Sequence, residues 1–105
     1  MLRDDILRNA AIIVTGARQD TYGDAGVNFT RIARLWSAYL NHPVTPTDVA
    51  CMMTMLKIAR LVGAEGDHLD SWVDACGYMA IGGELSGASW PPTARAQEDK
   101  EASDD

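Results

Sequence analysis

The sequence predicts an all-α protein, a compact bundle of four helices around an apolar central helix. Three observations lead to this prediction. Apolar residues recur at helical spacing in four segments, no segment alternates with the period of two that is typical of β-strands, and glycine or proline stands between the segments. The chain has 105 residues, of which 47% are hydrophobic, so it can form a single core.

Each of the four segments has the length of an ordinary globular helix. Asn28 is the expected N-cap of the second helix, and Thr45 or Thr47 that of the third, where Asp48 in the first turn suits the helix dipole. Gly82 and Gly83 are expected to end the fourth. The expected helices are residues 2–14, 28–41, 48–62 and 69–81.

The third helix is the one around which we expect the others to pack. It is apolar nearly all the way round, and its interior polar residues, Thr54, Lys57 and Arg60, recur every three positions as one narrow stripe. Such a helix belongs in the middle of a bundle, covered by other helices on three sides. Its apolar content exceeds what three short neighbours can cover, so we expect a homodimer or a higher homo-oligomer.

Composition limits the domain organisation and the class of protein. We expect one helical domain over residues 1–90 and a disordered acidic tail over residues 91–105. The formal net charge of -6 argues against a nucleic-acid partner, because such proteins carry a basic face. No apolar run approaches the roughly 18 residues of a membrane span, so we expect no membrane partner and a cytoplasmic protein. Cys51 and Cys76 are expected to be free, buried thiols.

Lys57 is the polar residue with the strongest functional signal. An ammonium group in the middle of an apolar helix needs a carboxylate, a phosphate or water. Asp70 and Asp74 on the next helix are four residues apart and therefore share a face. One interpretation is a structural ion pair that braces two helices. The other is that Asp70 and Asp74 hold a magnesium ion while Lys57, with Arg18 or Arg31, meets substrate phosphates.

The connection over residues 15–27 is long for a helical bundle, and long ordered loops are often functional. It carries Arg18, Tyr22 and Asp24, of which the last two belong to a Tyr-Gly-Asp sequence that could equally be a plain turn. Together with Asn28 and Trp72 these residues form the expected ligand-binding set. Lys57 and Asp74 are the expected catalytic residues if the protein is an enzyme.

Five sequence stretches carry a resemblance to known proteins: residues 18–24 (RQDTYGD), 28–36 (NFTRIARLW), 45–50 (TPTDVA), 56–61 (LKIARL) and 70–78 (DSWVDACGY). Together they resemble an uncharacterised family of small helical proteins from bacteriophages and prophages. More remotely, the layout is similar to the MazG-type all-α nucleoside triphosphate pyrophosphohydrolases, which implies carboxylates on adjacent helices, bound magnesium and paired subunits. The glutamate cluster that marks one helix of that family is missing here, and Asp70 and Asp74 match its second acidic signature loosely.

Two classes of function follow as expectations. The first is a phage protein that binds nucleotides or hydrolyses nucleoside triphosphates to release pyrophosphate with magnesium. The second is a non-enzymatic phage accessory protein that binds a host protein or sequesters a signalling nucleotide. A helical module whose ion pairs are all structural is the simplest alternative to both.

Overall fold

The structure, a computed structural model, describes residues 1–16 and 24–87 of the chain. All regular structure in these residues is α-helical. The prediction of an all-α protein with four helices is therefore confirmed for the described part of the chain. The helices are α1 (Arg3–Thr15), α3 (Ala25–Leu40), α4 (Pro46–Gly63) and α5 (Leu69–Leu85).

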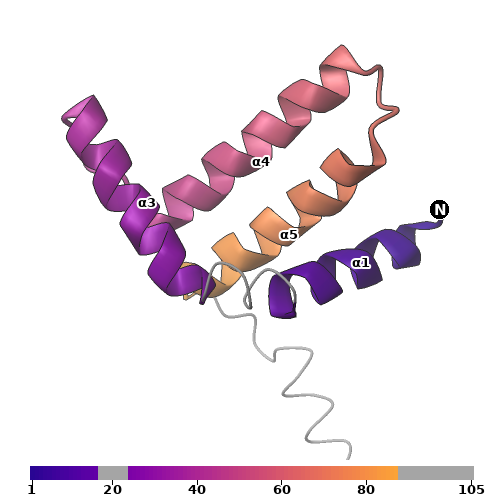
Figure 1. Ribbon diagram of the computed structural model, residues 1–105, viewed down its shortest axis with the longest axis horizontal. Helices are drawn as coiled ribbons and strands as arrows, with labels where there is room; N and C mark the ends of the chain where they lie inside the picture. Colours follow the sequence, from indigo (N-terminus) through magenta and orange to yellow (C-terminus); the bar gives the residue numbers. More distant parts are fainter. Residues whose placement is uncertain (17–23, 88–105) are drawn as a thin grey trace, which may run out of the picture.

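Helix α5 occupies the middle of the arrangement. Figure 1 shows α4 and α5 side by side as an antiparallel hairpin, with α1 on the other side of α5 and α3 crossing near the start of α4. We expected residues 48–62, the body of α4, in that middle position. Within this one chain α4 packs mainly against α5 and α3, and its outer side stays exposed, so coverage on three sides is not seen.

The core lies where α3, α4 and α5 meet. Its aromatic pair joins α3 to α5, because the rings of Phe29 and Tyr78 are tilted against each other with centroids 6.2 Å apart. Val49 is fully buried between them at the start of α4. The buried core residues are Phe29, Ala33, Val49, Ala50, Tyr78 and Ile81.

Two helix starts show how local sequence sets the boundaries. At α4, Thr45 is the N-cap and forms a capping box with Asp48: the Asp48 N–H donates to the Thr45 hydroxyl at 3.0 Å, and the Thr45 N–H donates to the carboxylate at 2.9 Å. At α3, the N-cap is Asp24 and not the expected Asn28. The Asp24 carboxylate accepts from the Val27 N–H at 3.3 Å, so the helix begins three residues earlier and Asn28 lies in its first turn.

Glycines in α5 allow neighbouring helices to approach closely. Gly77 lets α1 approach α5, because an added Cβ there would lie 3.0 Å from the side chain of Val14 in α1. Gly82 does not end the helix as expected; a Cβ there would lie 2.9 Å from that of Ala50 in α4. Packing against α4 thus keeps the chain helical through Gly82 and Gly83, up to Leu85.

The cysteine prediction holds in part. Both thiols are free; Cys76 is half-buried, but Cys51 is exposed because it faces outward from α4. In the described ranges, none of the helices has the length and hydropathy needed to span a membrane.

Candidate functional site

Lys57 and Asp74 are brought together by the α4–α5 hairpin. The Lys57 Nζ lies 3.0 Å from the Asp74 Oδ2, and the two side chains are 11% and 24% exposed. A pair at this distance is a charge-assisted hydrogen bond shielded from most of the solvent. The structure therefore shows the ion pair that we considered as the structural interpretation of Lys57.

Asp70 does not join this pair. It lies in the first turn of α5 and is exposed. Among the residues that the structure describes, no group of three or more His, Cys, Asp and Glu side chains could hold a metal ion. With Asp74 bound to Lys57, the described donors do not fit a pre-formed magnesium site, and the role of Asp70 and Asp74 as metal ligands stays a prediction.

The remaining predicted ligand-binding residues are spread over different parts of the fold. Trp72 is half-exposed on α5, and its indole N–H donates to the Gly66 carbonyl at 3.0 Å, which holds the ring against the α4–α5 loop. Asn28 is half-buried in the first turn of α3. Arg18 and Tyr22 lie outside the described residues.

Asp24, by contrast, lines a cavity of about 830 Å³ that neither Lys57 nor Asp74 lines. The cavity, called the α3 cavity below, is bounded by one face of α3, the start of α4 and the end of α5. Its size lies within the range of small-molecule sites. The lining residues are Asp24, Gly26, Val27, Thr30, Arg31, Arg34, Leu35, Pro46 and Leu85.

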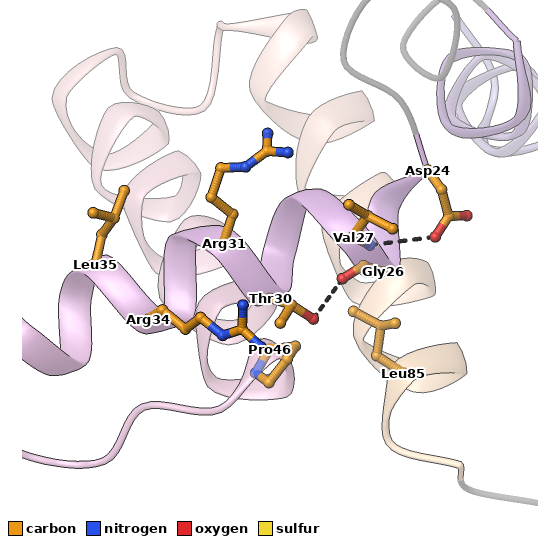
Figure 2. Close-up of a pocket in the computed structure, with 9 residues that line it drawn as sticks. All are labelled: Asp24, Gly26, Val27, Thr30, Arg31, Arg34, Leu35, Pro46 and Leu85. Atoms are coloured by element: carbon orange, nitrogen blue, oxygen red, sulfur yellow. Dashed lines mark hydrogen bonds between the residues drawn. The ribbon is translucent and has the colours of Figure 1, made fainter.

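Two arginines dominate the charge of the α3 cavity. Arg31 and Arg34 are one helical turn apart, and Figure 2 shows Arg34 extending toward Pro46 while Arg31 leaves α3 in another direction. Both are exposed, and within residues 1–16 and 24–87 neither forms an ion pair. The carboxylate at the other end, that of Asp24, accepts the capping hydrogen bond from Val27. The cavity thus has a cationic end and an anionic end.

Apolar and polar side chains divide the rest of the α3 cavity wall. Val27, Leu35 and Leu85 supply the apolar surface. The Thr30 hydroxyl donates to the Gly26 carbonyl at 2.7 Å and keeps its lone pairs for an incoming donor. The spacing of Arg31 and Arg34 is visible in the sequence, where both fall on the polar face of the second predicted helix. Leu85 could not be found in this way, because it lies beyond the expected end of the fourth helix.

Asp48 is the described carboxylate with a clear shift in acidity. Its pKa is lowered from the usual value of 3.8, chiefly by the Thr45 N–H that donates to it and then by the Thr45 hydroxyl. Asp48 lies in the first turn of α4 as expected, and the cause of the shift, its hydrogen bonds with Thr45, marks it as part of the helix cap.

The chain is similar to two curated phage proteins. It is 48% identical over 77 residues to the Gene 55 protein of Mycobacterium phage L5, an alignment that covers 72% of this chain and 49% of that protein. The Gene 55 protein of Mycobacterium phage D29 is 40% identical over 77 residues, covering 73% and 50%. The chain therefore spans about half the length of the curated relatives it matches. No solved structure matches it significantly.

The resemblance to a phage family is confirmed in its coarser form, since both relatives are phage proteins. The similarity to MazG-type enzymes is not shown by these comparisons. A family model matches residues 5–86, which include all four described helices except the first two residues of α1. The chain belongs to the family described as a domain of unknown function, DUF6378.

Proposed function

We propose that the chain is a phage ligand-binding protein that holds a nucleotide in the α3 cavity without hydrolysing it. The observation that carries this proposal is the pair of arginines, Arg31 and Arg34, on the wall of a cavity of about 830 Å³. Guanidinium groups present planar forks of donors that match phosphate oxygens. Sequestration of a signalling nucleotide is one function that such a site would serve.

The charge distribution of the α3 cavity supports one orientation of the ligand. Phosphates belong at the Arg31 and Arg34 end, because the Asp24 carboxylate repels them from the other. The sugar and base then lie along Val27 and Leu85, where Asp24 accepts hydrogen bonds from a hydroxyl or an amine. Both arginines are solvent-exposed, so the cavity attracts the anion without having to bury an unpaired charge of its own.

We favour binding over magnesium-dependent pyrophosphohydrolysis, the other function that the MazG resemblance implies. Hydrolysis with magnesium needs carboxylates that are free to hold the ion beside the phosphates. Asp74 is engaged by Lys57 at 3.0 Å, and the α3 cavity contains one carboxylate, Asp24, among its described lining residues. The proposal therefore assigns Lys57 and Asp74 to the scaffold.

Calorimetric titration tests this proposal. The wild-type protein is titrated with nucleoside triphosphates, their deoxy forms and cyclic nucleotides, each with and without magnesium, while pyrophosphate release is measured in parallel. We expect micromolar binding of at least one ligand without turnover. Because each arginine–phosphate contact is worth about 1.5–3 kcal/mol, replacing both Arg31 and Arg34 by Ala should raise Kd at least about 150-fold.

Arg60→Ala is the matched control, since Arg60 is an exposed arginine on α4 outside the α3 cavity. It should leave Kd within about twofold of wild type. Pyrophosphate release that requires magnesium would overturn the non-hydrolytic proposal and restore the enzyme hypothesis. Equal loss of affinity in Arg60→Ala and in the double variant would show that the ligand binds elsewhere.

Binding of a host protein is the second candidate, supported by the apolar side chains that α3 leaves in solvent. Tyr39 is 90% exposed and Leu35 is 65% exposed, one turn apart on the same helix. Tyrosine is a typical anchor of protein interfaces, and Leu35 adds apolar surface beside it. A host protein that co-purifies with wild type and is lost with Tyr39→Ser would support this candidate. Self-association, expected from the apolar content of residues 48–62, is part of either proposal.

A further inference from the structure

The outer side of α4 carries one continuous apolar stripe. Cys51 is exposed, and Met55, Ile58 and Val62 are 58%, 49% and 76% exposed. Their spacing of four, three and four residues is that of one side of a coiled coil, so the four side chains form a single row along about three turns. They are called the outer stripe below.

The charged residues of α4 leave the outer stripe uninterrupted. Lys57 points to α5, where it pairs with Asp74. Arg60 is roughly opposite the outer stripe at 100° per residue. Asp48 extends the same row at its N-terminal end, three residues before Cys51. An apolar row of this length needs a partner helix to remove it from water.

We propose that α4 pairs antiparallel with α4 of a second copy of this chain through the outer stripe. The inference rests on the self-association proposed above and is independent of the α3 cavity. The four-three-four spacing of the outer stripe is the same from either end of the helix. A two-fold axis at the midpoint of the stripe therefore places Cys51 of each copy against Val62 of the other, and Met55 of each copy against Ile58 of the other. This is the self-complementarity that an isologous dimer interface requires.

The area of the outer stripe suits a dimer. With Cys51 exposed and the other three side chains 49–76% exposed, the outer stripe leaves roughly 400 Å² of largely apolar surface in solvent, the size at which patches mark interaction sites. If the apolar part of the interface makes up about 60% of its area, this apolar surface implies a buried area of about 650 Å² per copy and about 1,300 Å² in total. That total lies within the range of specific, stable interfaces.

The helix dipoles favour the antiparallel direction. In a parallel pair the two Asp48 carboxylates, which share the row of the outer stripe, would face each other as like charges. In the antiparallel pair each Asp48 lies at the level of residue 65 of the partner, two residues past the end of its α4 at Gly63, so it comes near Glu65 of the α4–α5 loop and not a second Asp48. In the antiparallel pair the two helix dipoles point in opposite directions, which is their favourable arrangement.

Cysteine cross-linking distinguishes the two directions. In a Cys76→Ala background, Val62→Cys should oxidise to a covalent dimer through Cys51 of one copy and the new thiol of the other. The same background without Val62→Cys should not cross-link. In the antiparallel pair, Cys51 of one copy lies at the level of Val62 of the other. The two Cys51 residues are therefore eleven residues apart along the helix axis, about 16 Å, which is beyond the reach of a disulfide. Arg60→Cys, on the opposite side of α4, is the matched control and should stay monomeric on a non-reducing gel.

Light scattering at about 100 µM protein distinguishes two ways in which the inference could be wrong: the chain forms a dimer through another surface, or it forms no dimer. We expect a dimer for wild type and for Arg60→Glu, and at least a 100-fold weaker dimer for Met55→Glu, which buries a charge in the interface. A dimer that survives Met55→Glu would overturn the outer stripe as the interface while leaving self-association intact. A wild-type monomer would overturn both, and cross-linking through Cys51 alone would show a parallel pair.

Discussion

Replacing Asp74 by Asn tests whether the Lys57–Asp74 pair is part of the scaffold. The substitution keeps the size of the side chain and removes its charge, which leaves the Lys57 ammonium, 11% exposed, facing a neutral amide. Loss of one partner costs 3–5 kcal/mol for a fully buried ion pair. Because Asp74 is 24% exposed and water can reach the pair, we expect a smaller loss of about 2 kcal/mol in the free energy of unfolding.

Urea denaturation at fixed protein concentration measures this loss, with thermal unfolding as a second probe. For a domain of this size, about 2 kcal/mol corresponds to a fall of roughly 10 °C in Tm. Asp70→Asn is the matched control, because it makes the same chemical change one turn earlier on α5 at an exposed position. It should change stability by less than about 0.5 kcal/mol.

Adding Lys57→Met completes a double-mutant cycle. If the two residues stabilise each other, Asp74→Asn should cost much less in the Lys57→Met background, since no ammonium is then left without a counter-ion. The reasoning is refuted if Asp74→Asn leaves stability unchanged and weakens nucleotide binding. That result would make Asp74 a ligand or metal-binding residue and favour the enzyme hypothesis.

Further substitutions test the packing and the helix cap. Gly82→Ala should lose about 1–3 kcal/mol in urea denaturation because its Cβ would press on Ala50, whereas Gly83→Ala, which meets no atom within 4 Å, should gain about 0.5–1 kcal/mol. Thr45→Ala should cost about 1 kcal/mol in the same assay through loss of the α4 cap. The lowered pKa of Asp48 means that its contribution to stability is complete above its usual pKa of 3.8 and is lost as pH falls through the lower folded value. When thermal unfolding is measured between pH 7 and pH 3, the Tm of Asp48→Asn should therefore fall less than that of wild type at the acid end of this range. Equal melting of Gly82→Ala and Gly83→Ala would contradict the close approach of α5 to α4.

The positions of the helices could be predicted because their signals are local. The Thr45 and Asp48 pattern specifies a start, and apolar periodicity specifies the body of each helix. Where two good caps compete, the sequence does not decide: Asp24 and Asn28 are equally suitable residue types, and the chain uses Asp24. Gly82 misled the prediction for a different reason, since its role is to admit Ala50 of another helix.

The candidate site was less predictable than the fold. The Lys57–Asp74 pair follows from the cost of burying a charge, and the structure shows it. The α3 cavity does not follow from any one segment, because its wall combines Arg34 of α3 with Pro46 of α4 and Leu85 of α5. Spacing along one helix shows which residues share a face and says nothing of which other elements complete a cavity.

The unusual composition of α4 is explained if this helix packs on two sides. Its inner stripe, Ala50, Thr54, Lys57 and Leu61, repeats the four-three-four spacing of the outer stripe one residue earlier. All four inner residues are largely buried. Ala50 and Lys57 meet Gly82 and Asp74 of α5.

The N-terminal halves of the two stripes of α4 differ in the size of their side chains. Small residues in the inner stripe, Ala50 and Thr54, let the α5 backbone approach, as the Cβ position at Gly82 shows. The outer stripe has larger apolar residues, such as Met55 and Ile58, which suit a second helix at a greater distance. Periodicity alone could not assign the stripes to their partners, because both have the same spacing. The contacts of Ala50 and Lys57 with α5 assign the inner stripe, and the exposed outer stripe is the one we propose to pair with a helix of another chain.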